Sequence, residues 1–296
     1  MSSSTVTPNQ IGSAQVPTTS NAPAHTASGA PVDPVPQVII LYRVVVVFIL
    51  ASLFWKSTFY PAIYHIYTSY QLQDGFFPPI LTNTYLLAAL MLIPIIIGML
   101  AMLIRNQAYL IFQATVTAAF MFGMCIHQGS YNDVTFLTCF WVSLWCVWYA
   151  IKLKTPEKEL IPRAKVFGIL ILSLVFFGGA VGKWTPGYWS GQVLYEIYFV
   201  DRDFWFFNLL RAAYDAETLR SIATFYSRMV VIAESSCALL WLLPPKIAGG
   251  IGLAMLMGIV LFSNVQLFSV MFCLIGLTLI ALHEPKPANA NLFQTA

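Results

Sequence analysis

Charged side chains are scarce in this sequence. Lysine, arginine, aspartate and glutamate together make up 9% of its 296 residues, whereas 58% are hydrophobic. A typical soluble domain is about 25% charged, so these few charges cannot cover the surface of a water-soluble protein. The scarcity excludes a soluble enzyme and a disordered chain, and the net charge of +3 gives no reason to expect nucleic acid as a partner. We therefore expect a lipid bilayer around the protein.

Spacings typical of metal and redox sites are also missing. The five cysteines lie in apolar stretches without a CxxC spacing, and the four histidines show neither HxxxH nor HExxH. We therefore interpret the cysteines as buried thiols and expect no metal cofactor.

The first 37 residues have little apolar side-chain surface to bury. Ser, Thr, Pro, Ala and Gly fill 24 of these positions, so we predict a disordered tail over 1–37. A basic stretch followed by an apolar one is absent from this tail. We therefore expect no cleavable secretory signal and assign membrane insertion to the first helix.

Long apolar runs are what the sequence has in abundance. A membrane-spanning helix needs about 20 apolar residues, and such runs alternate with short polar breaks from Val38 onward. The pattern predicts an all-α, polytopic transmembrane helix bundle over 38–283, followed by a short polar tail over 284–296. About eight spans are predicted, at 38–55, 80–104, 108–126, 134–151, 165–182, 222–243, 247–263 and 266–282. The last two are either separate tilted helices or one kinked element.

Basic residues indicate the orientation of the bundle. The densest basic loop, 152–165, carries five lysines and arginines, and short loops of this kind stay in the cytoplasm. Counting spans outward places three further basic residues on the same side: Arg105, Lys246 and Lys286. We therefore expect an integral membrane protein with both termini in the cytoplasm. The segments expected outside are 56–79, 127–133 and 183–221.

The last of these outside segments is rich in both charges and aromatic rings. Its sequences WTPGYW and DFWFFNLL are typical of the lipid headgroup zone, where apolar rings meet water. We predict an interfacial, partly helical segment over 186–216 that lies across the outer mouth of the bundle. The alternative is an aromatic belt that only anchors the protein.

Lys183 follows an otherwise apolar helix whose end contains three glycines, Gly178, Gly179 and Gly182. Small residues permit close helix approach, which would hold the amine in a poorly hydrated pocket. Desolvation favours a neutral amine, and a neutral amine can act as a base. The alternative is an ammonium group that reaches out into water.

Glu234 lies more than one helical turn inside an apolar run. A carboxylate at that depth needs a partner, and Arg228, six positions away, is off the favoured helical spacing. We expect the partner on another helix, with Lys183 and Arg43 as the candidates. Such a pair either has a functional role or only fixes helix packing.

Polar side chains near three predicted helix ends are further candidates. Arg43, about one turn into the first span, either contacts a substrate or reaches the lipid headgroups. Asn132 and Asp133 precede the fourth span, and Asp133 is expected to cap that helix. Asn264 and Gln266 either satisfy backbone groups freed at the polar break or bind the polar head of a ligand.

Three stretches together resemble a known membrane domain: VFFGGAVGKWTPGYWSGQVL, VVIAESSCALLWLL and SNVQLFSVMFCLIGL. They are similar to the membrane domain of vitamin K-dependent gamma-carboxylases, which recurs in bacteria as the HTTM (horizontally transferred transmembrane) proteins. The similarity extends over most of 38–283, and its most specific parts are Gly182–Gly191 and Asn264–Ser269. Arg43 and the YND stretch at 131–133 also fit.

The resemblance implies a fold, a ligand and a site. In the carboxylases, the lysine at the position of Lys183 deprotonates vitamin K hydroquinone, and an acidic residue falls at the position of Glu234. The resemblance therefore implies a quinone or hydroquinone near these two residues, a lipid-facing entrance and a bacterial inner membrane. The ligand-binding residues expected around it are Arg43, Asn132, Trp184, Trp189, Asn264 and Gln266.

The chain also departs from the carboxylase pattern. Val134 and Leu261 stand where that pattern has histidines, and the chain stops at Ala296. We therefore expect no lumenal domain for propeptide and glutamate substrates, and no carboxylation of a protein glutamate.

Three functions remain open at this point. The first is a membrane protein whose gamma-carboxylase-like bundle binds or deprotonates a quinone-like lipid. The alternative is a non-catalytic assembly protein that binds a separate soluble protein partner, which the departures favour. A transporter would need a polar path through the bundle, whereas only Glu234 lies deep.

Overall fold

The computed structural model describes residues 36–69, 76–131, 133–200, 205–262 and 267–284. Every regular element in these ranges is a helix, which confirms the all-α fold class. The tail predicted over 1–37 and the polar tail over 284–296 lie almost wholly outside the described residues.

Five helices in the described ranges are long and apolar enough to cross a membrane. They are α1 (Gln37–Ser69), α2 (Thr84–Ala101), α3 (Gln107–Ile126), α4 (Val134–Ile151) and α5 (Glu157–Val181). Their number and length are compatible with an integral, multi-pass membrane protein. The largest differences from the predicted boundaries are that α1 continues beyond 55 and α5 begins before 165, and α2 is a few residues shorter at each end than the predicted 80–104.

The three remaining predicted spans contain helices that fall outside this group of five. They are α9 (Ala216–Cys237), α10 (Pro245–Phe262) and α11 (Phe268–Leu282). The apolar parts of α10 and α11 are shorter than a typical span. The single helix predicted over 222–243 is wrong in its boundaries, because α9 ends at Cys237 and a separate 3-10 turn follows at Leu240–Leu242. α10 and α11 are two helices packed against each other rather than one kinked element.

Asparagine and aspartate side chains begin four of the helices. They are Asn83 for α2, Asn106 for α3, Asp133 for α4 and Asp215 for α9. Each side-chain oxygen accepts a hydrogen bond from a backbone N–H of the first turn, and these N–H groups have no partner inside the helix. The cap expected at Asp133 is therefore confirmed.

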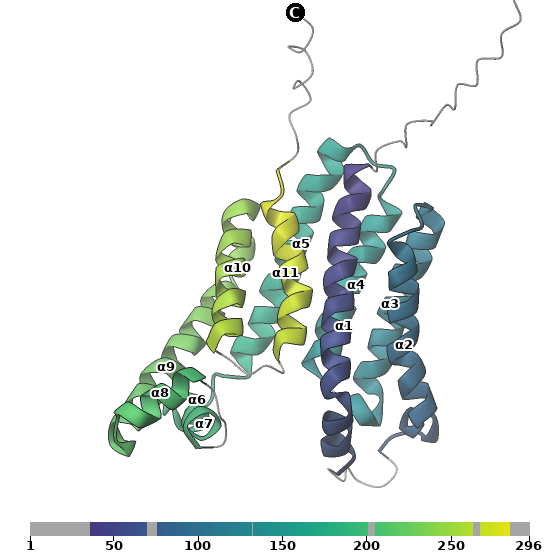
Figure 1. Ribbon diagram of the computed structural model, residues 1–296. Helices are drawn as coiled ribbons and strands as arrows, with labels where there is room; N and C mark the ends of the chain where they lie inside the picture. The colour runs from purple at the N-terminus through teal and green to yellow at the C-terminus, as the bar shows by residue number, and fades with distance from the viewer. Residues whose placement is uncertain (1–35, 70–75, 132, 201–204, 263–266, 285–296) are drawn as a thin grey trace, which may run out of the picture. The chain divides into compact units, whose positions relative to one another are not determined.

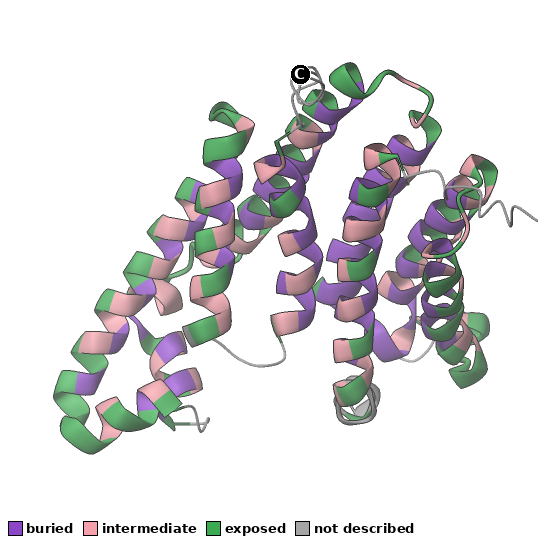
Figure 2. Cartoon of the chain, turned by 45° about the horizontal axis from the view of Figure 1, so that its top comes forward, coloured by how far each residue is buried: buried purple, intermediate pink, exposed green. Residues whose placement is uncertain are grey.

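α11 occupies the middle of the bundle, where it packs against α1, α4, α5 and α10 (Figure 1). Figure 2 shows buried residues on the helix faces that meet and exposed residues on the outward faces. Glycines bring α10 close to its neighbours. A Cβ on Gly249 would lie 2.8 Å from the Cβ of Ala281, and one on Gly252 would lie 2.6 Å from the Cδ2 of Leu172. Close approach through small residues is typical of helices packed in a membrane.

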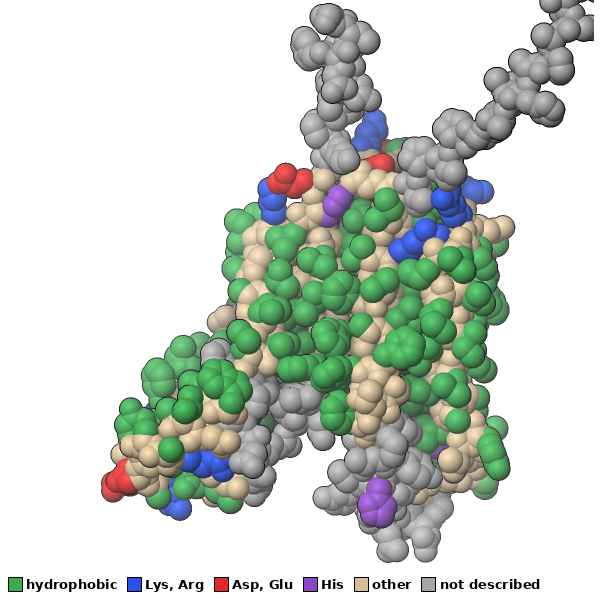
Figure 3. Space-filling model, in the orientation of Figure 1, with side chains coloured by type: hydrophobic (Ala, Val, Ile, Leu, Met, Phe, Trp, Pro, Cys, Tyr) green, Lys and Arg blue, Asp and Glu red, His purple; other side chains and the backbone are tan. Residues whose placement is uncertain are grey.

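The bundle surface is largely apolar. Figure 3 shows hydrophobic side chains over its middle, with lysine and arginine side chains at the end where α1 begins and others, next to an acidic side chain, at the lower left. Large apolar side chains are exposed on different helices, among them Val47, Ile96, Phe112, Leu170 and Ile251. An apolar surface of this extent matches lipid chains rather than water.

The described residues between α5 and α9 form four short helical elements. They are α6 (Pro186–Trp189), α7 (Gln192–Tyr195), a π-helical turn (Glu196–Val200) and α8 (Trp205–Ala213). α6 and α7 pack against α9. Three side chains of α9 donate hydrogen bonds to successive carbonyl oxygens of this connection: Ser227 to Tyr188 (2.5 Å), Arg228 to Trp189 (3.1 Å) and Thr224 to Ser190 (2.8 Å).

Gly191 completes this attachment. Its φ is +77°, and a Cβ there would lie 2.4 Å from the Cα of Thr224. Only glycine adopts that conformation at that distance without strain. We call residues 188–191 and the side chains of Thr224, Ser227 and Arg228 the α9 clasp. The clasp holds the segment that follows α5 against α9.

Candidate functional site

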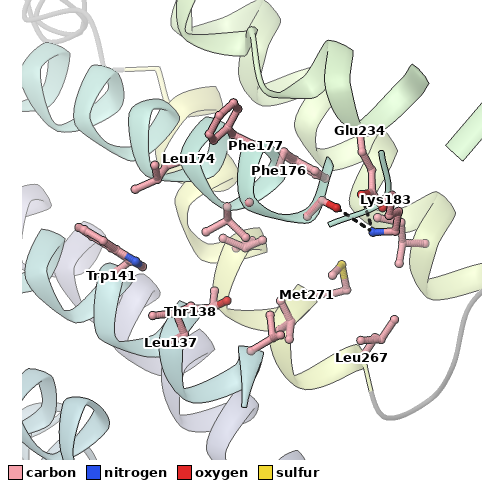
Figure 4. A pocket seen from close by; sticks show the side chains of 17 residues that line it. Leu137, Thr138, Trp141, Leu174, Phe176, Phe177, Lys183, Glu234, Leu267 and Met271 are labelled. Carbon is pink, nitrogen blue, oxygen red and sulfur yellow. Dashed lines mark hydrogen bonds and ion pairs between the residues drawn. The ribbon is translucent and has the colours of Figure 1, made fainter. Parts of the chain in front are cut away.

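A cavity of about 530 Å³ lies between α4, α5 and α11. Cavities of roughly 300–1,000 Å³ are the usual size of small-molecule sites. The lining is largely apolar, with Lys183 and Glu234 together on one side of the view and Trp141 on the other (Figure 4). The lining residues are Val134, Leu137, Thr138 and Trp141 on α4, 174–179 on α5, Lys183, Glu234, Ile259, Leu267, and Val270, Met271 and Leu274 on α11.

An ion pair forms the charged part of this cavity. The Nζ of Lys183 lies 2.6 Å from the Oε2 of Glu234 and 3.4 Å from the carbonyl oxygen of Gly179. The two side chains are 24% and 10% exposed. The prediction that Glu234 pairs with a cation from another segment is therefore confirmed. The ammonium group does not extend alone into water.

The absence of a side chain at Gly179 leaves space for the ion pair against α5. A Cβ on Gly179 would lie 3.2 Å from the Oε2 of Glu234 and 3.8 Å from the Nζ of Lys183. The first distance is tighter than most real contacts of a Cβ, so a larger residue would push the carboxylate away. The end of α5 and the clasp on α9 together place the lysine beside the carboxylate.

The cavity is not sealed from the surface of the bundle. Six of its lining residues are also exposed: Val134 and Leu137 on α4, Leu174, Phe177 and Gly178 on α5, and Leu267 just before α11. None of the six has a polar side chain, and five of them belong to α4 and α5, so the route between these two helices suits a hydrophobic molecule better than an ion.

The phenol of Tyr188, in α6, interacts electrostatically with the Glu234 carboxylate. Burial raises the pKa of the Tyr188 phenol, and the carboxylate of Glu234 raises that pKa further. The phenol therefore stays neutral at physiological pH. The backbone carbonyl oxygen of Tyr188 accepts the clasp hydrogen bond from Ser227.

The other predicted ligand-binding residues lie outside the cavity lining or outside the described residues. The prediction of Arg43 as a candidate partner of Glu234 is wrong. The guanidinium of Arg43 donates instead to the carbonyl oxygens of Ala101 (3.2 Å) and Ile104 (3.3 Å) at the end of α2. Trp184 and Trp189 contact each other, with ring centres 5.1 Å apart, and neither lines the cavity. Asn132, Asn264 and Gln266 lie outside the described residues.

Trp184 takes part in the site indirectly. Its indole Nε1 donates to the Oγ of Ser235, 3.0 Å away, next to Glu234 in the chain. Together with the clasp, this bond ties the residue after Lys183 to α9. The tryptophan thus supports the ion pair rather than facing the cavity.

A second ion pair inside the bundle escaped the sequence analysis. The Nζ of Lys56 on α1 lies 2.5 Å from the Oδ2 of Asp133, and the two side chains are 7% and 6% exposed. Because the first span was predicted to end at 55, Lys56 was assigned to an outer loop. In the structure, α1 continues to Ser69. A lysine at the edge of a long apolar run was the signal that could have indicated it. Thr138 and Trp141 were also missed, because nothing in the sequence separates them from other core residues of α4.

No family model matches the chain, and the searches of curated proteins and of solved structures return no match. Within the described ranges, no group of three or more His, Cys, Asp or Glu residues could hold a metal ion. The geometry of the cavity and its ion pair is therefore the basis for assigning a function.

Proposed function

We propose that this chain is a multi-pass membrane protein with an HTTM-like, gamma-carboxylase-like bundle that binds a quinone-like lipid and takes a proton from its reduced form. One observation carries the proposal: the Lys183–Glu234 ion pair faces an apolar cavity that is open between α4 and α5. The motif at 182–191 supports the family assignment. An apolar tail would lie among the lining side chains, and the polar head would meet the ion pair.

The charges in the cavity favour a head group without net charge. The ammonium and the carboxylate balance each other at 2.6 Å. A fatty acid or a phosphate would bring an additional negative charge into an apolar cavity, which is costly without a further cation. A quinone or hydroquinone is neutral, and its oxygens can accept from Lys183 and, when reduced, donate to Glu234.

The pair can also move a proton without leaving a lone charge. The ammonium proton of Lys183 passes to Glu234, which leaves a neutral amine and a carboxylic acid. The amine then accepts the phenolic proton of a bound hydroquinone, as a general base does. The products are a phenolate, the Lys183 ammonium and the Glu234 carboxylic acid. The phenolate forms beside the ammonium, so its charge is compensated where it arises.

The arrangement in the membrane belongs to the same proposal. We propose eight spans: the five long helices together with α9, α10 and α11. The packing of α11 against α1, α4 and α5, three of the long apolar helices, supports counting α11 as a span. The basic end of the bundle faces the cytoplasm with both termini, and the segment 186–216 lies in the opposite interface. A reporter fused after residue 296 tests the orientation, and a periplasmic signal would contradict it.

The test of the ligand begins with the whole protein extracted gently from its membrane. Native mass spectrometry should detect a retained quinone at one per chain. In lipid nanodiscs without oxygen, a reduced naphthoquinone with one isoprene unit should bind and show phenolate absorbance at a lower pH than it does in free solution. Lys183→Met should abolish this absorbance, because no amine remains to accept the proton.

Lys246→Met is the matched control for this experiment. Lys246 is exposed, pairs with Glu284 and does not line the cavity, so its loss should leave binding and phenolate formation unchanged. Unchanged phenolate formation in Lys183→Met would eliminate the base role. Co-purification of a stoichiometric soluble protein without any lipid would favour the alternative of a non-catalytic assembly protein.

A further inference from the structure

The last turn of α5 presents bare backbone to the cavity at Gly178. This residue is exposed, lines the cavity and directly precedes Gly179, the glycine that faces the ion pair. A Cβ built on it meets no heavy atom of the described residues within 4 Å. Open space therefore lies in front of this backbone, at a residue that belongs to the cavity lining.

Gly178 differs in this respect from the next residue. Gly179 faces the carboxylate of Glu234, and a Cβ there would be crowded at 3.2 Å. Glycine is the weakest helix former after proline, so each glycine in a helix turn calls for a physical reason. For Gly179 that reason is the ion pair. For Gly178 no described side chain occupies the vacant position.

We propose that Gly178 sets the size of the head group that the cavity accepts. This inference rests on the proposed function, because the head group meant is that of the quinone-like lipid. The absence of a side chain lets a flat ring lie against the α5 backbone, within the turn that carries Gly179 and leads to Lys183. Glycine is used where a ligand must come this close to the main chain. A methyl group at position 178 takes up the space that the wider part of a ring would fill.

Two oxidised quinones with the same single-isoprene tail, a one-ring benzoquinone and a two-ring naphthoquinone, serve as probes. Their dissociation constants are measured in nanodiscs of phosphatidylcholine from the quenching of tryptophan fluorescence, since Trp141 lines the cavity. Gly178→Ala should weaken binding of the naphthoquinone by about tenfold, because overfilling a packed site carries a steric cost. Binding of the benzoquinone should weaken much less.

Gly250→Ala is the matched control. It is the same substitution inside a helix, α10, at a residue that does not line the cavity, and its added Cβ also meets no heavy atom of the described residues within 4 Å. This variant should bind both quinones as the wild type does. The thermal midpoints of both variants are recorded so that a loss of binding is not mistaken for unfolding.

The possible outcomes distinguish a failure of this inference from a failure of the proposed function, the binding of a quinone-like lipid. If the wild type binds both quinones and Gly178→Ala loses the two-ring quinone selectively, the inference holds. If the wild type binds them but the two glycine variants behave alike, the role of Gly178 is overturned while the proposed function stands. If the wild type binds neither quinone, or retains only phospholipid, both are overturned.

Discussion

Within the described part of the bundle, two lysine–carboxylate pairs are buried or half-buried, and they differ in their surroundings. Lys56 and Asp133 are 7% and 6% exposed, and the ammonium group lies 5.9 Å from the centre of the Phe136 ring. The second carboxylate oxygen of Asp133 caps α4 through the N–H of Thr135, at 2.9 Å. The Lys183–Glu234 pair has a similar N–O distance but lines a cavity instead.

The comparison shows that a buried charge does not by itself mark a site. The Lys56–Asp133 pair is enclosed by protein groups and joins the start of α4 to α1, which is a structural task. The Lys183–Glu234 pair has open space beside it, so a ligand can reach its atoms. Enclosure also sets the energetic consequences of losing one partner, because a charge left in an apolar interior cannot be solvated.

Lys56→Met should have the largest effect on stability. The substitution leaves the Asp133 carboxylate buried without its cation, and changes of this kind lower the free energy of unfolding by about 3–5 kcal/mol. Lys183→Met should cost less than Lys56→Met, because the carboxylate that it leaves without a cation lines the cavity and is 10% rather than 6% exposed. Detergent-induced unfolding followed by circular dichroism measures both. Equal losses in the two variants would contradict the distinction between an enclosed and an accessible pair.

Asp133→Asn in the Lys56→Met background should recover at least about 2 kcal/mol of the lost stability, because it removes the unpaired charge. Asparagine keeps the side-chain oxygen that begins α4. The same unfolding measurement on the double variant checks this. The companion variant with Asp133→Ala lacks the cap and should remain about 1 kcal/mol less stable than the one with asparagine. A double variant no more stable than Lys56→Met would show that the charge is not the cause.

Gly179→Ala should lower the free energy of unfolding by about 1–3 kcal/mol, the usual cost of overpacking. The reason is the 3.2 Å approach of the new Cβ to the Oε2 of Glu234. Thermal unfolding monitored by tryptophan fluorescence gives the comparison with Gly182→Ala, which should be as stable as the wild type. Were the two variants equally stable, the carboxylate of Glu234 would not be held against α5.

Acid should weaken the turn between α3 and α4 through His127. The backbone N–H of Gly129 donates to Nδ1 of this ring, at 3.0 Å, so Nε2 carries the proton and bonds to the carbonyl oxygen of Asn83, also at 3.0 Å. Burial lowers the pKa of His127 below its model-compound value of 6.5. The neutral ring fits the folded state, and a second proton on Nδ1 would displace Gly129.

The resulting pH dependence has a definite sign. The unfolded chain binds the proton more readily, so stability is complete above pH 6.5 and is lost as the pH falls through the lower pKa of the folded state. For one group the slope is at most about 1.4 kcal/mol per pH unit. His127→Gln should flatten this part of the profile when unfolding is measured between pH 7 and pH 5. A slope of the opposite sign in the wild type would refute the assignment.

The helical, membrane-compatible character of the chain could be predicted because hydropathy and capping are local properties. Apolar runs between polar breaks located α2, α3 and α4 within a few residues, and Asp133 was recognised as a cap. The boundaries at 55 and 222–243 failed for a physical reason. The ion pair between Lys56 and Asp133 holds α1 just past its predicted end, and the α9 clasp stabilises a helix that is too polar to be recognised by hydropathy alone.

The candidate site was only partly predictable. The cost of a deep carboxylate required a cation near Glu234, but the choice between Lys183 and Arg43 depended on which helix ends meet. Arg43 satisfies carbonyl oxygens at the end of α2 instead. The two tryptophans of the WTPGYW motif looked like ligand contacts, whereas Trp184 bonds to Ser235 and supports the ion pair.

The sequence alone thus indicated a protein suited to a bilayer, since too few charges are present to cover it in water, and a helical one, since its apolar runs have the length of spanning helices. Which lysine meets which carboxylate was decided only when the helices packed. Lys183 and Glu234 are 51 positions apart in the chain, and no local pattern connects them. The end of α5, the clasp and α9 bring them together, and the space left beside them turns an ion pair into a candidate site.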